Sequence, residues 1–205
     1  MSDPFKTVLL FGAPGVGKGT QGKCLAAIPG FYHCASGDVF RRVDAHSELG
    51  KIFFAHSSRG ELVPDDVTVQ MWHGAMNARV VLGDYKPRRE LLILDGIPRT
   101  PNQVELMKEH VETLRVVHLE TSDVEAMVQR LLLRARKQNR HDDADPKVIR
   151  RRWDVYERET KPVLSRYPQE LVTRIDAMGS PAQVLAEVLK VIAPIHREHF
   201  EPFEG

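Results

Sequence analysis

Short apolar runs alternate with amphipathic or polar segments along the whole chain. Five of these runs are continuous enough to be strands buried on both faces, as in a parallel sheet. They are TVLLF at 7–11, FYHCAS at 31–36, LLILD at 91–95, LRVVHLE at 114–120 and LVTRIDA at 171–177. Helical patterns separate them, so the chain predicts an α/β fold with a five-stranded parallel sheet covered by helices on both faces.

The segments between these runs predict five longer helices and two appendages. The helices are expected at 20–28, 65–82, 122–133, 147–164 and 181–192. Residues 36–63 form a polar, helical excursion whose first helix could be capped by Ser36 or Asp38. Residues 134–143 are too polar to belong to a core. We expect both segments to be appendages on the sheet, where moving parts are often found.

Length and charge narrow the class of protein. The chain has 205 residues, enough for one domain with small insertions, and its net charge of +1 suggests neither a nucleic-acid nor a membrane partner. We expect no membrane span and, from the start MSDPFKTV, no secretory signal. Cys24 and Cys34 are too far apart to form a CxxC pair. We therefore expect no zinc site, and a cytoplasmic location with reduced thiols.

The stretch LLFGAPGVGKGTQ, at 9–21, carries the strongest chemical signal. Gly12 to Lys18 has the spacing of a phosphate-binding loop, between a predicted strand and a predicted helix. Its glycines leave room for backbone N–H groups to face phosphate oxygens at a helix N-terminus. Lys18 would reach the β- and γ-phosphates. The hydroxyl that usually follows the lysine comes one place later, at Thr20, because Gly19 intervenes.

This loop resembles that of adenylate kinases and their nucleoside monophosphate kinase relatives, which carry G-x-P-G-x-G-K-G-T. Further stretches match the same family in order over about residues 7–193. They are ASGDVFR at 35–41, GELVPDD at 60–66, DGIPRTPNQ at 95–103, RLLLRARKQNRHDD at 130–143 and RRRWDVYERETKPVLSRY at 150–167. The resemblance implies a P-loop kinase that transfers the γ-phosphoryl group of MgATP to AMP, giving two ADP.

The resemblance also implies how the single kinase domain, 1–205, is divided. The core would comprise 1–35, 64–133 and 144–205. Residues 36–63 would be the monophosphate-binding insertion. Residues 134–143 would be a short lid, which lacks the zinc-bearing insertion of the long-lid form. We expect a monomer, since no apolar stripe suggests an interface.

Donor-site and magnesium-site residues are implied by the same resemblance. The expected ATP-binding residues are Gly15, Val16, Gly17, Lys18, Gly19, Thr20, Arg130, Arg134 and Gly179. Thr20 and Asp95 would hold Mg²⁺, partly through water, because Asp95 ends a buried strand where such a carboxylate is expected.

Acceptor-site residues come from the insertion, the DGIPR turn and the arginines. The expected AMP-binding residues are Ser36, Arg41, Glu61, Leu62, Val63, Gly96, Ile97, Pro98, Arg99, Gln103, Arg140 and Arg152. Arginine suits phosphoryl transfer because its planar fork binds two phosphate oxygens and keeps its charge. The expected catalytic residues are Lys18, Arg99, Arg134, Arg140 and Arg152, with Arg151 the alternative to Arg152.

Three positions bear on which base is accepted. Ser36 retains a hydroxyl where adenylate kinases carry threonine, and Asp38, in place of glutamate, also resembles the adenylate type. Gln103 offers an amide that can pair with the edge of adenine. Such a match discriminates because the wrong base leaves buried polar groups unpaired. These positions favour AMP. A CMP or UMP kinase on the same fold, or a nucleotide-binding switch without transfer, remains open at this point.

Overall fold

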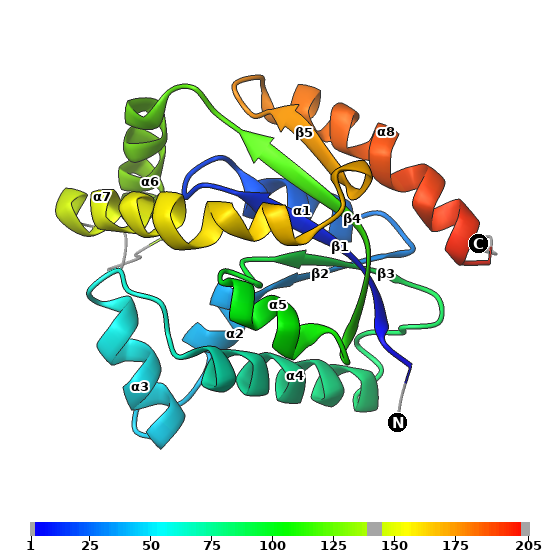
Figure 1. Ribbon diagram of the computed structural model, residues 1–205, viewed down its shortest axis with the longest axis horizontal. Helices are drawn as coiled ribbons and strands as arrows, with labels where there is room; N and C mark the ends of the chain where they lie inside the picture. The colour runs from blue at the N-terminus through cyan, green and yellow to red at the C-terminus, as the bar shows by residue number, and fades with distance from the viewer. Residues whose placement is uncertain (1–2, 139–144, 202–205) are drawn as a thin grey trace.

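The computed structural model describes residues 3–138 and 145–201, and these build one five-stranded sheet (Figure 1). All strand pairs are parallel, in the order β2-β3-β1-β4-β5. The strands are β1 (Phe5–Gly12), β2 (Phe31–Ala35), β3 (Leu91–Asp95), β4 (Val111–Glu120) and β5 (Val172–Asp176). The predicted α/β class and the parallel five-stranded sheet are confirmed.

The centre of the sheet is its most apolar part. Every residue of β3 is buried, and Leu9 of β1 lies between Leu94 of β3 and Val116 of β4. Strands covered on both faces by helices must be apolar on both faces, which is why the sequence shows continuous runs rather than alternation.

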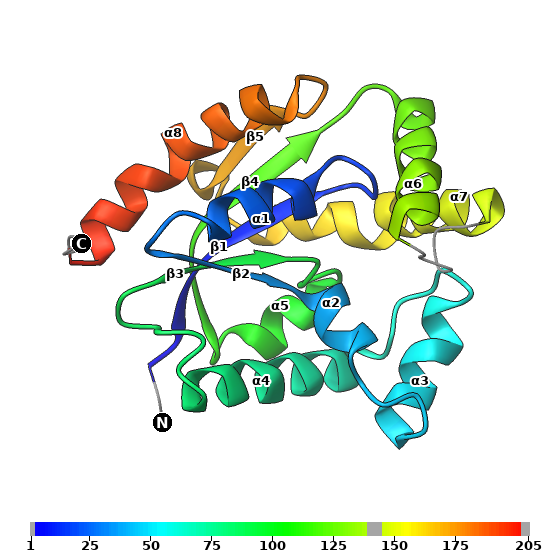
Figure 2. The ribbon, with the colours of Figure 1, turned by 180° about the vertical axis from the view of Figure 1, so that it is seen from behind.

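Eight α-helices are assigned within the described residues. They are α1 (Lys18–Ala26), α2 (Ser36–Arg41), α3 (Glu48–Ser57), α4 (Asp65–Val81), α5 (Pro101–Met107), α6 (Val124–Gln138), α7 (Pro146–Val155) and α8 (Pro181–His199). Helices α1 and α8 lie on one face of the sheet, seen in front in Figure 2. Helices α4, α5 and α7 lie on the other face, seen in front in Figure 1.

The helix predicted at 147–164 is not one regular α-helix. Helix α7 passes into a π-helical turn, η2 (Tyr156–Thr160), and then into a 3-10 segment, η3 (Lys161–Arg166). Pro162 explains the change, because proline lacks the N–H that an α-helix would use there and its ring clashes with the preceding turn. Residues 146–166 are therefore helical throughout, but the type of helix changes twice along them.

The last helix is longer than the predicted 181–192. Ser180 caps α8 by accepting from Gln183 N, while the Gln183 side chain accepts from Ser180 N. The helix continues through Pro194, and beyond it Ile195 and Phe200 are buried. Tertiary packing therefore outweighs the local preference of proline to end the helix.

The carboxyl ends of the strands meet at one edge, which positions the site. In the strand register, Leu10 lies beside Asp95, and Gly12 lies beside Leu119. The loop after β1 therefore begins at the middle of the sheet, between the ends of β3 and β4. Ligands of open parallel α/β sheets bind at this edge.

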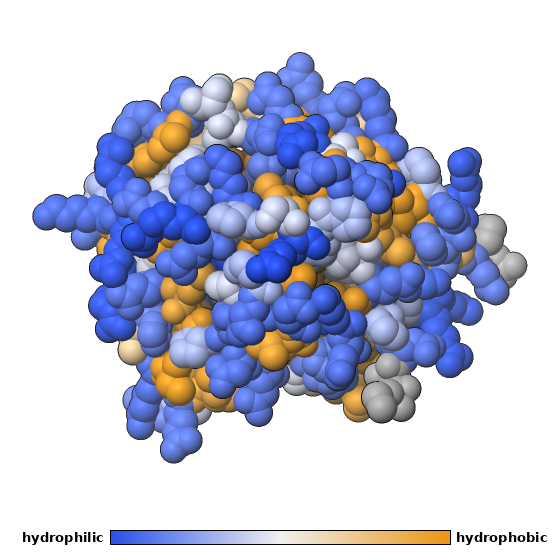
Figure 3. All heavy atoms as spheres, viewed as in Figure 1, coloured by the Kyte–Doolittle hydropathy of each residue, from blue (hydrophilic) through white to orange (hydrophobic). Residues whose placement is uncertain are grey.

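The surface visible in Figure 3 is mostly hydrophilic, with hydrophobic side chains in small separate groups. Among the described residues, no helix is both long and apolar enough to cross a membrane.

Candidate functional site

The loop after β1 takes a path that only glycine allows at three positions. Gly12, Gly15 and Gly17 have φ of 143°, 91° and 102°. A Cβ on Gly12 would lie 2.5 Å from the carbonyl oxygen of Leu119, and one on Gly15 would lie 2.9 Å from that of Met127. The loop is thus packed tightly against β4 and α6.

Helix α1 begins directly after this loop with an uncapped N-terminus. Gly17 is the N-cap residue and supplies no side chain, and the first turn contains no acidic residue. The first N–H groups of the helix and the positive end of its dipole are therefore available to an anion. The amide nitrogen of the exposed Thr20 donates to Gly17 O at 2.9 Å, so its hydroxyl lies on this first turn.

Lys18 folds its side chain back over the loop. Its Nζ donates to the carbonyl oxygens of Gly12 at 2.7 Å and Ala13 at 3.1 Å. Burial lowers the pKa of Lys18 from 10.5 to about 8, an effect partly opposed by the negative charge of Asp95. A polyanion would stabilise the charged ammonium, so the site favours binding of phosphate.

Arg99 is held by the tight turn after β3. Its Nε donates to Gly96 O at 2.6 Å, and the Ile97–Pro98 peptide bond inside this turn is cis. Gly96 has a φ of 86°. Burial lowers the pKa of Arg99 to about 10, and the neighbouring charge of Arg152 contributes to this lowering. Arg99 is therefore still a cation at neutral pH, in surroundings that favour an anionic ligand.

The fold brings together cations that lie far apart in the sequence. The charge on Lys18 is influenced by Arg99, Arg152 and Arg134, and that on Arg99 by Arg152 and Arg41. Asp95, buried at the end of β3, offsets part of this charge at Lys18 and Arg99, and Asp38 pairs with Arg41 at 2.6 Å. Such a concentration of positive charge is costly by itself and becomes favourable when phosphates occupy it.

A cavity lies between the insertion, the 96–99 turn and α7. Its wall includes eleven of the residues expected to bind AMP or act in catalysis. They are Lys18, Arg41, Glu61, Leu62, Val63, Gly96, Ile97, Pro98, Arg99, Gln103 and Arg152.

Ser36 departs from its expected place. Its side chain is completely buried and does not line the cavity. The Oγ atom lies beside the 96–99 turn, where a Cβ on Gly96 would approach it to 2.7 Å. Neither Ser36 nor Asp38 caps α2, since the N-cap is Ala35 and Asp38 pairs with Arg41 at 2.6 Å. That capping prediction is wrong because α2 begins at Ser36 itself.

Gln103 is buried at the cavity wall with its amide held from two sides. Its Oε1 accepts from Arg99 N at 2.7 Å, and its Nε2 donates to Asp65 Oδ1 at 2.8 Å. Because a backbone N–H can only donate, this contact decides which amide atom is the oxygen. Each of the two atoms keeps capacity for one more hydrogen bond.

Two of the residues expected to bind ATP, Arg130 and Gly179, are exposed to solvent. Arg130 is exposed on α6, and its Nη1 lies 3.5 Å from Ala177 O, in the turn that leads to the exposed Gly179. Arg134 lies one turn later on the same helix and is half-buried. The structure therefore brings Arg130 and the turn before Gly179 together beside the phosphate-binding loop. Arg140 lies outside the described residues.

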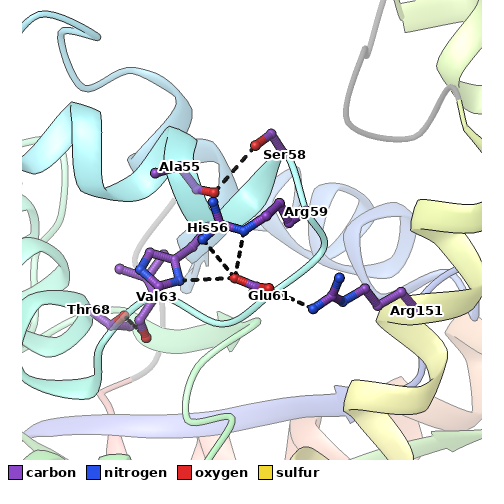
Figure 4. A network of polar contacts seen from close by, with 8 residues as sticks. All are labelled: Ala55, His56, Ser58, Arg59, Glu61, Val63, Thr68 and Arg151. Carbon is purple, nitrogen blue, oxygen red and sulfur yellow. Dashed lines mark hydrogen bonds and ion pairs between the residues drawn. The ribbon is translucent and has the colours of Figure 1, made fainter.

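Arg151 and Arg152 point in different directions. Arg152 lines the cavity, whereas Arg151 pairs with Glu61 at 2.6 Å (Figure 4). Consecutive residues on an α-helix are about 100° apart around its axis, so only one of them can face the cavity. The structure therefore places Arg152, and not Arg151, beside the other cations.

Sequence reasoning missed several residues of the cavity wall. Phe40 and Phe53 form an apolar part, with ring centroids 5.8 Å apart, and Tyr156 and Thr160 contribute from η2. Asp65, which orients Gln103, was also missed as a site residue. The spacing of apolar residues in 36–63 could have indicated the two phenylalanines, but the others depend on contacts between distant segments.

Asp95, one of the two expected magnesium-site residues, lies beside the helical turn that carries the other, Thr20. Asp95 faces the first turn of α1, since a Cβ on Gly19 would lie 3.8 Å from Asp95 Oδ2. One carboxylate and one hydroxyl from the same region would suit Mg²⁺, which keeps several waters and takes few protein ligands. No group of three or more His, Cys, Asp or Glu residues that could hold a metal occurs in the described part of the chain. Cys24 and Cys34 are free thiols.

The adenylate kinase family model matches this chain over residues 10–172. The matched region contains the phosphate-binding loop, the insertion, the 96–99 turn and α7.

Curated relatives are similar over almost their whole length. An adenylate kinase of Kocuria rhizophila is 37% identical over 191 residues, covering 90% of this chain and 97% of the relative. One of Thermobifida fusca is 38% identical over 191 residues, with the same coverage of 90% and 97%. One of Thermus thermophilus is 34% identical over 193 residues, covering 91% and 96%.

Proposed function

The chain belongs to the adenylate kinase family, and from that premise we propose that its cleft transfers the γ-phosphoryl group of ATP to AMP. The reaction is reversible and gives two ADP. The observation that carries this proposal is the cluster of Lys18, Arg41, Arg99, Arg134 and Arg152 around the end of β3. Two nucleotide polyanions can meet only where positive charge of this kind offsets their repulsion.

The transfer needs positioning and charge neutralisation rather than a covalent intermediate. Lys18 and the N–H groups of the loop would hold the donor phosphates, while Arg41 and Arg99 would hold the acceptor phosphate. Arg134 and Arg152 would neutralise the charge on the transferring group, and Arg140 is proposed to join them. No general base is required, because the acceptor phosphate is already an anion.

Magnesium is proposed to bind near Thr20 and Asp95. When bound with ATP, Mg²⁺ would neutralise charge on the β- and γ-phosphates. The proximity of Asp95 to the first turn of α1 supports this placement. The chain's own contribution would be the Thr20 hydroxyl and a carboxylate that orients water.

AMP is the proposed acceptor. The amide of Gln103, oriented by Asp65 and Arg99 N, has one donor and one acceptor position left, which match the N1 and N6 positions of adenine. The adenylate kinase relatives do not favour a CMP or UMP kinase, or a switch without transfer. Ser36 is proposed to act on this pocket indirectly, by supporting the Gly96 turn.

The remaining assignments stay predictions. They are the division into a core, an insertion at 36–63 and a short lid at 134–143, a monomeric state and a cytoplasmic location. The donor adenine is proposed to lie between Arg130 and the turn at Gly179, which the contact between Arg130 and Ala177 O supports.

The test is ADP formation from MgATP with AMP, CMP, UMP, GMP or dTMP as acceptor. A strong preference for AMP is expected. A preference for CMP or UMP would overturn the role of Gln103 but keep the arginine assignments. If ATP binds and no monophosphate accepts the phosphoryl group, the proposed transfer is wrong.

A further inference from the structure

The carboxylate of Glu61 is the centre of a polar network at the end of the insertion (Figure 4). Oε2 accepts from Arg59 Nε at 2.9 Å and lies 3.6 Å from His56 Nδ1, while Oε1 accepts from Arg151 Nη2 at 2.6 Å. The hydrogen bond from Arg59 lowers the pKa of Glu61, so the carboxylate is charged at neutral pH. Glu61 thus joins two residues of its own segment to one residue of α7.

The contact between Glu61 and Arg151 is the charged part of a wider junction. Beside it, Gly60 has a φ of 71° and packs on α7, where a Cβ would lie 3.1 Å from Arg152 Cγ and 3.2 Å from Val148 O. The end of the insertion therefore lies directly against α7. These two segments also form facing parts of the cavity wall, through Leu62 on one side and Arg152 on the other.

Three consecutive arginines of α7 have three different tasks in this geometry. Arg150 pairs with Glu125 of α6 at 2.9 Å, Arg151 pairs with Glu61 of the insertion, and Arg152 lines the cavity. Helix α7 is thereby attached to two neighbouring segments by the residues that directly precede Arg152. A shift of the insertion away from α7 would break the Arg151 contact and widen the cavity at Leu62.

We propose that Glu61 and Arg151 form a positioning pair that holds the insertion against α7 and so shapes the AMP site. Neither residue needs to touch the nucleotide: Glu61 acts through the adjoining Leu62, and Arg151 acts through the adjoining Arg152. The inference rests on the proposed function, because it assigns the cavity to AMP. It also gives Glu61 a task other than direct contact with AMP.

The expected effect is modest and specific to one substrate. The side chains of Arg151 and Glu61 are 53% and 28% exposed. Ion pairs of this exposure contribute little, so loss of the pair corresponds to about a two- to fivefold rise in KM for AMP. KM for ATP and kcat should stay within about twofold, and the effect should shrink at high salt because exposed charges are screened.

The experiment is a double-mutant cycle on the full chain with Arg151→Ala, Glu61→Ala and the double variant. Steady-state KM for AMP, KM for ATP and kcat are measured at low and at high salt, and AMP binding is measured separately by titration calorimetry. Lys190→Ala is the matched control, since Lys190 pairs with Glu187 at 2.6 Å on the distant α8. Arg151→Lys tests whether the charge alone restores the contact.

The proposal expects the double variant to resemble each single variant in KM for AMP, and Arg151→Lys to recover much of the loss. Additive effects of the two single changes, or a change no larger than that of Lys190→Ala, would overturn it. A fall in thermal stability without a change in AMP affinity would also overturn it, since the pair would then be purely structural. If the unaltered chain transfers no phosphoryl group, the proposed function fails instead.

Discussion

Gln103 Nε2 donates to Asp65 Oδ1 at 2.8 Å, across 38 positions of sequence, while Gln103 Oε1 accepts from Arg99 N at 2.7 Å. One residue at the start of α4 and one in the turn after β3 thus hold the same buried amide. Arg99, proposed to bind the phosphate of AMP, and Gln103, proposed to bind its base, are thus connected by a single hydrogen bond. If both proposals hold, the two ends of the acceptor site are positioned together.

Asp65→Ala should weaken AMP as an acceptor. It removes the carboxylate that orients Gln103, at a cost comparable to the net contribution of one hydrogen bond, so kcat/KM for AMP should fall about three- to tenfold. The measurement is kcat/KM for AMP and CMP. Asn102→Ala is the control, because the exposed Asn102 side chain bonds the other oxygen of Asp65 and leaves Gln103 untouched. Equal losses in both variants would contradict the role of the oriented amide.

Lys18→Met should lower turnover by roughly two to three orders of magnitude, the usual effect of losing one charge-stabilising donor. The same variant should be more stable than the original chain at pH 7. The buried ammonium is costly to the folded state, since its pKa there, about 8, lies below the ordinary 10.5. The difference in unfolding free energy should be on the order of 1–2 kcal/mol after allowance for partial exposure.

The gain in unfolding free energy of Lys18→Met should decrease as the pH rises. Between pH 8 and 10.5 the unfolded chain binds more protons at Lys18 than the folded chain, so the stability of the original protein rises with pH. The advantage of Lys18→Met should therefore be greatest below pH 8 and decrease towards pH 10.5. Urea unfolding at neutral pH and at two alkaline values inside that window measures it. A constant difference across the series would contradict a buried ammonium.

Arg99→Ala should fold normally and lose about two to three orders of magnitude in turnover. Its guanidinium is buried among other cations, which lowers its pKa to about 10, so its removal relieves repulsion rather than breaking a core. Arg99→Lys keeps the charge without the planar fork, so its turnover should lie between that of the original chain and that of Arg99→Ala. Turnover and circular dichroism are the measurements, and near-normal activity of a folded Arg99→Ala protein would refute the assignment.

Asp95→Asn should raise the concentration of Mg²⁺ needed for half-maximal activity by about tenfold, because it removes the carboxylate that is proposed to orient metal-bound water. Titration of activity with Mg²⁺ at fixed ATP checks this. Asp123→Asn is a suitable control, since the Asp123 side chain accepts from Ala126 N at the start of α6. An unchanged magnesium requirement would remove Asp95 from the metal site.

Gly22→Ala should destabilise the fold. A Cβ at Gly22 would approach the ring of His33 to 2.1 Å, because this ring extends from β2 against α1. Overpacking of this kind costs about 1–3 kcal/mol. Thermal unfolding measures the loss, and Gly74→Ala, where nothing lies within 4 Å, should be neutral or slightly stabilising. A neutral Gly22→Ala would show that His33 can move aside.

Local sequence was sufficient for the features that depend on a few neighbouring residues. The apolar run LLILD is a strand from Leu91 to Asp95, and the sheet is parallel as its continuous runs predicted. The glycine positions of the phosphate-binding loop were recognisable because a close backbone approach and a positive φ leave few other choices of residue. The order of motifs along the chain was likewise enough to indicate the family.

Tertiary structure decided the features that depend on how elements rotate and pack against one another. Whether Arg151 or Arg152 faces the cavity follows from the rotation of α7, and the pairing of Glu61 with Arg151 spans 90 positions. Ser36 is buried under the Gly96 turn because β2 and β3 end side by side. Composition and spacing describe one segment at a time, whereas these contacts exist only after the sheet has brought distant segments together.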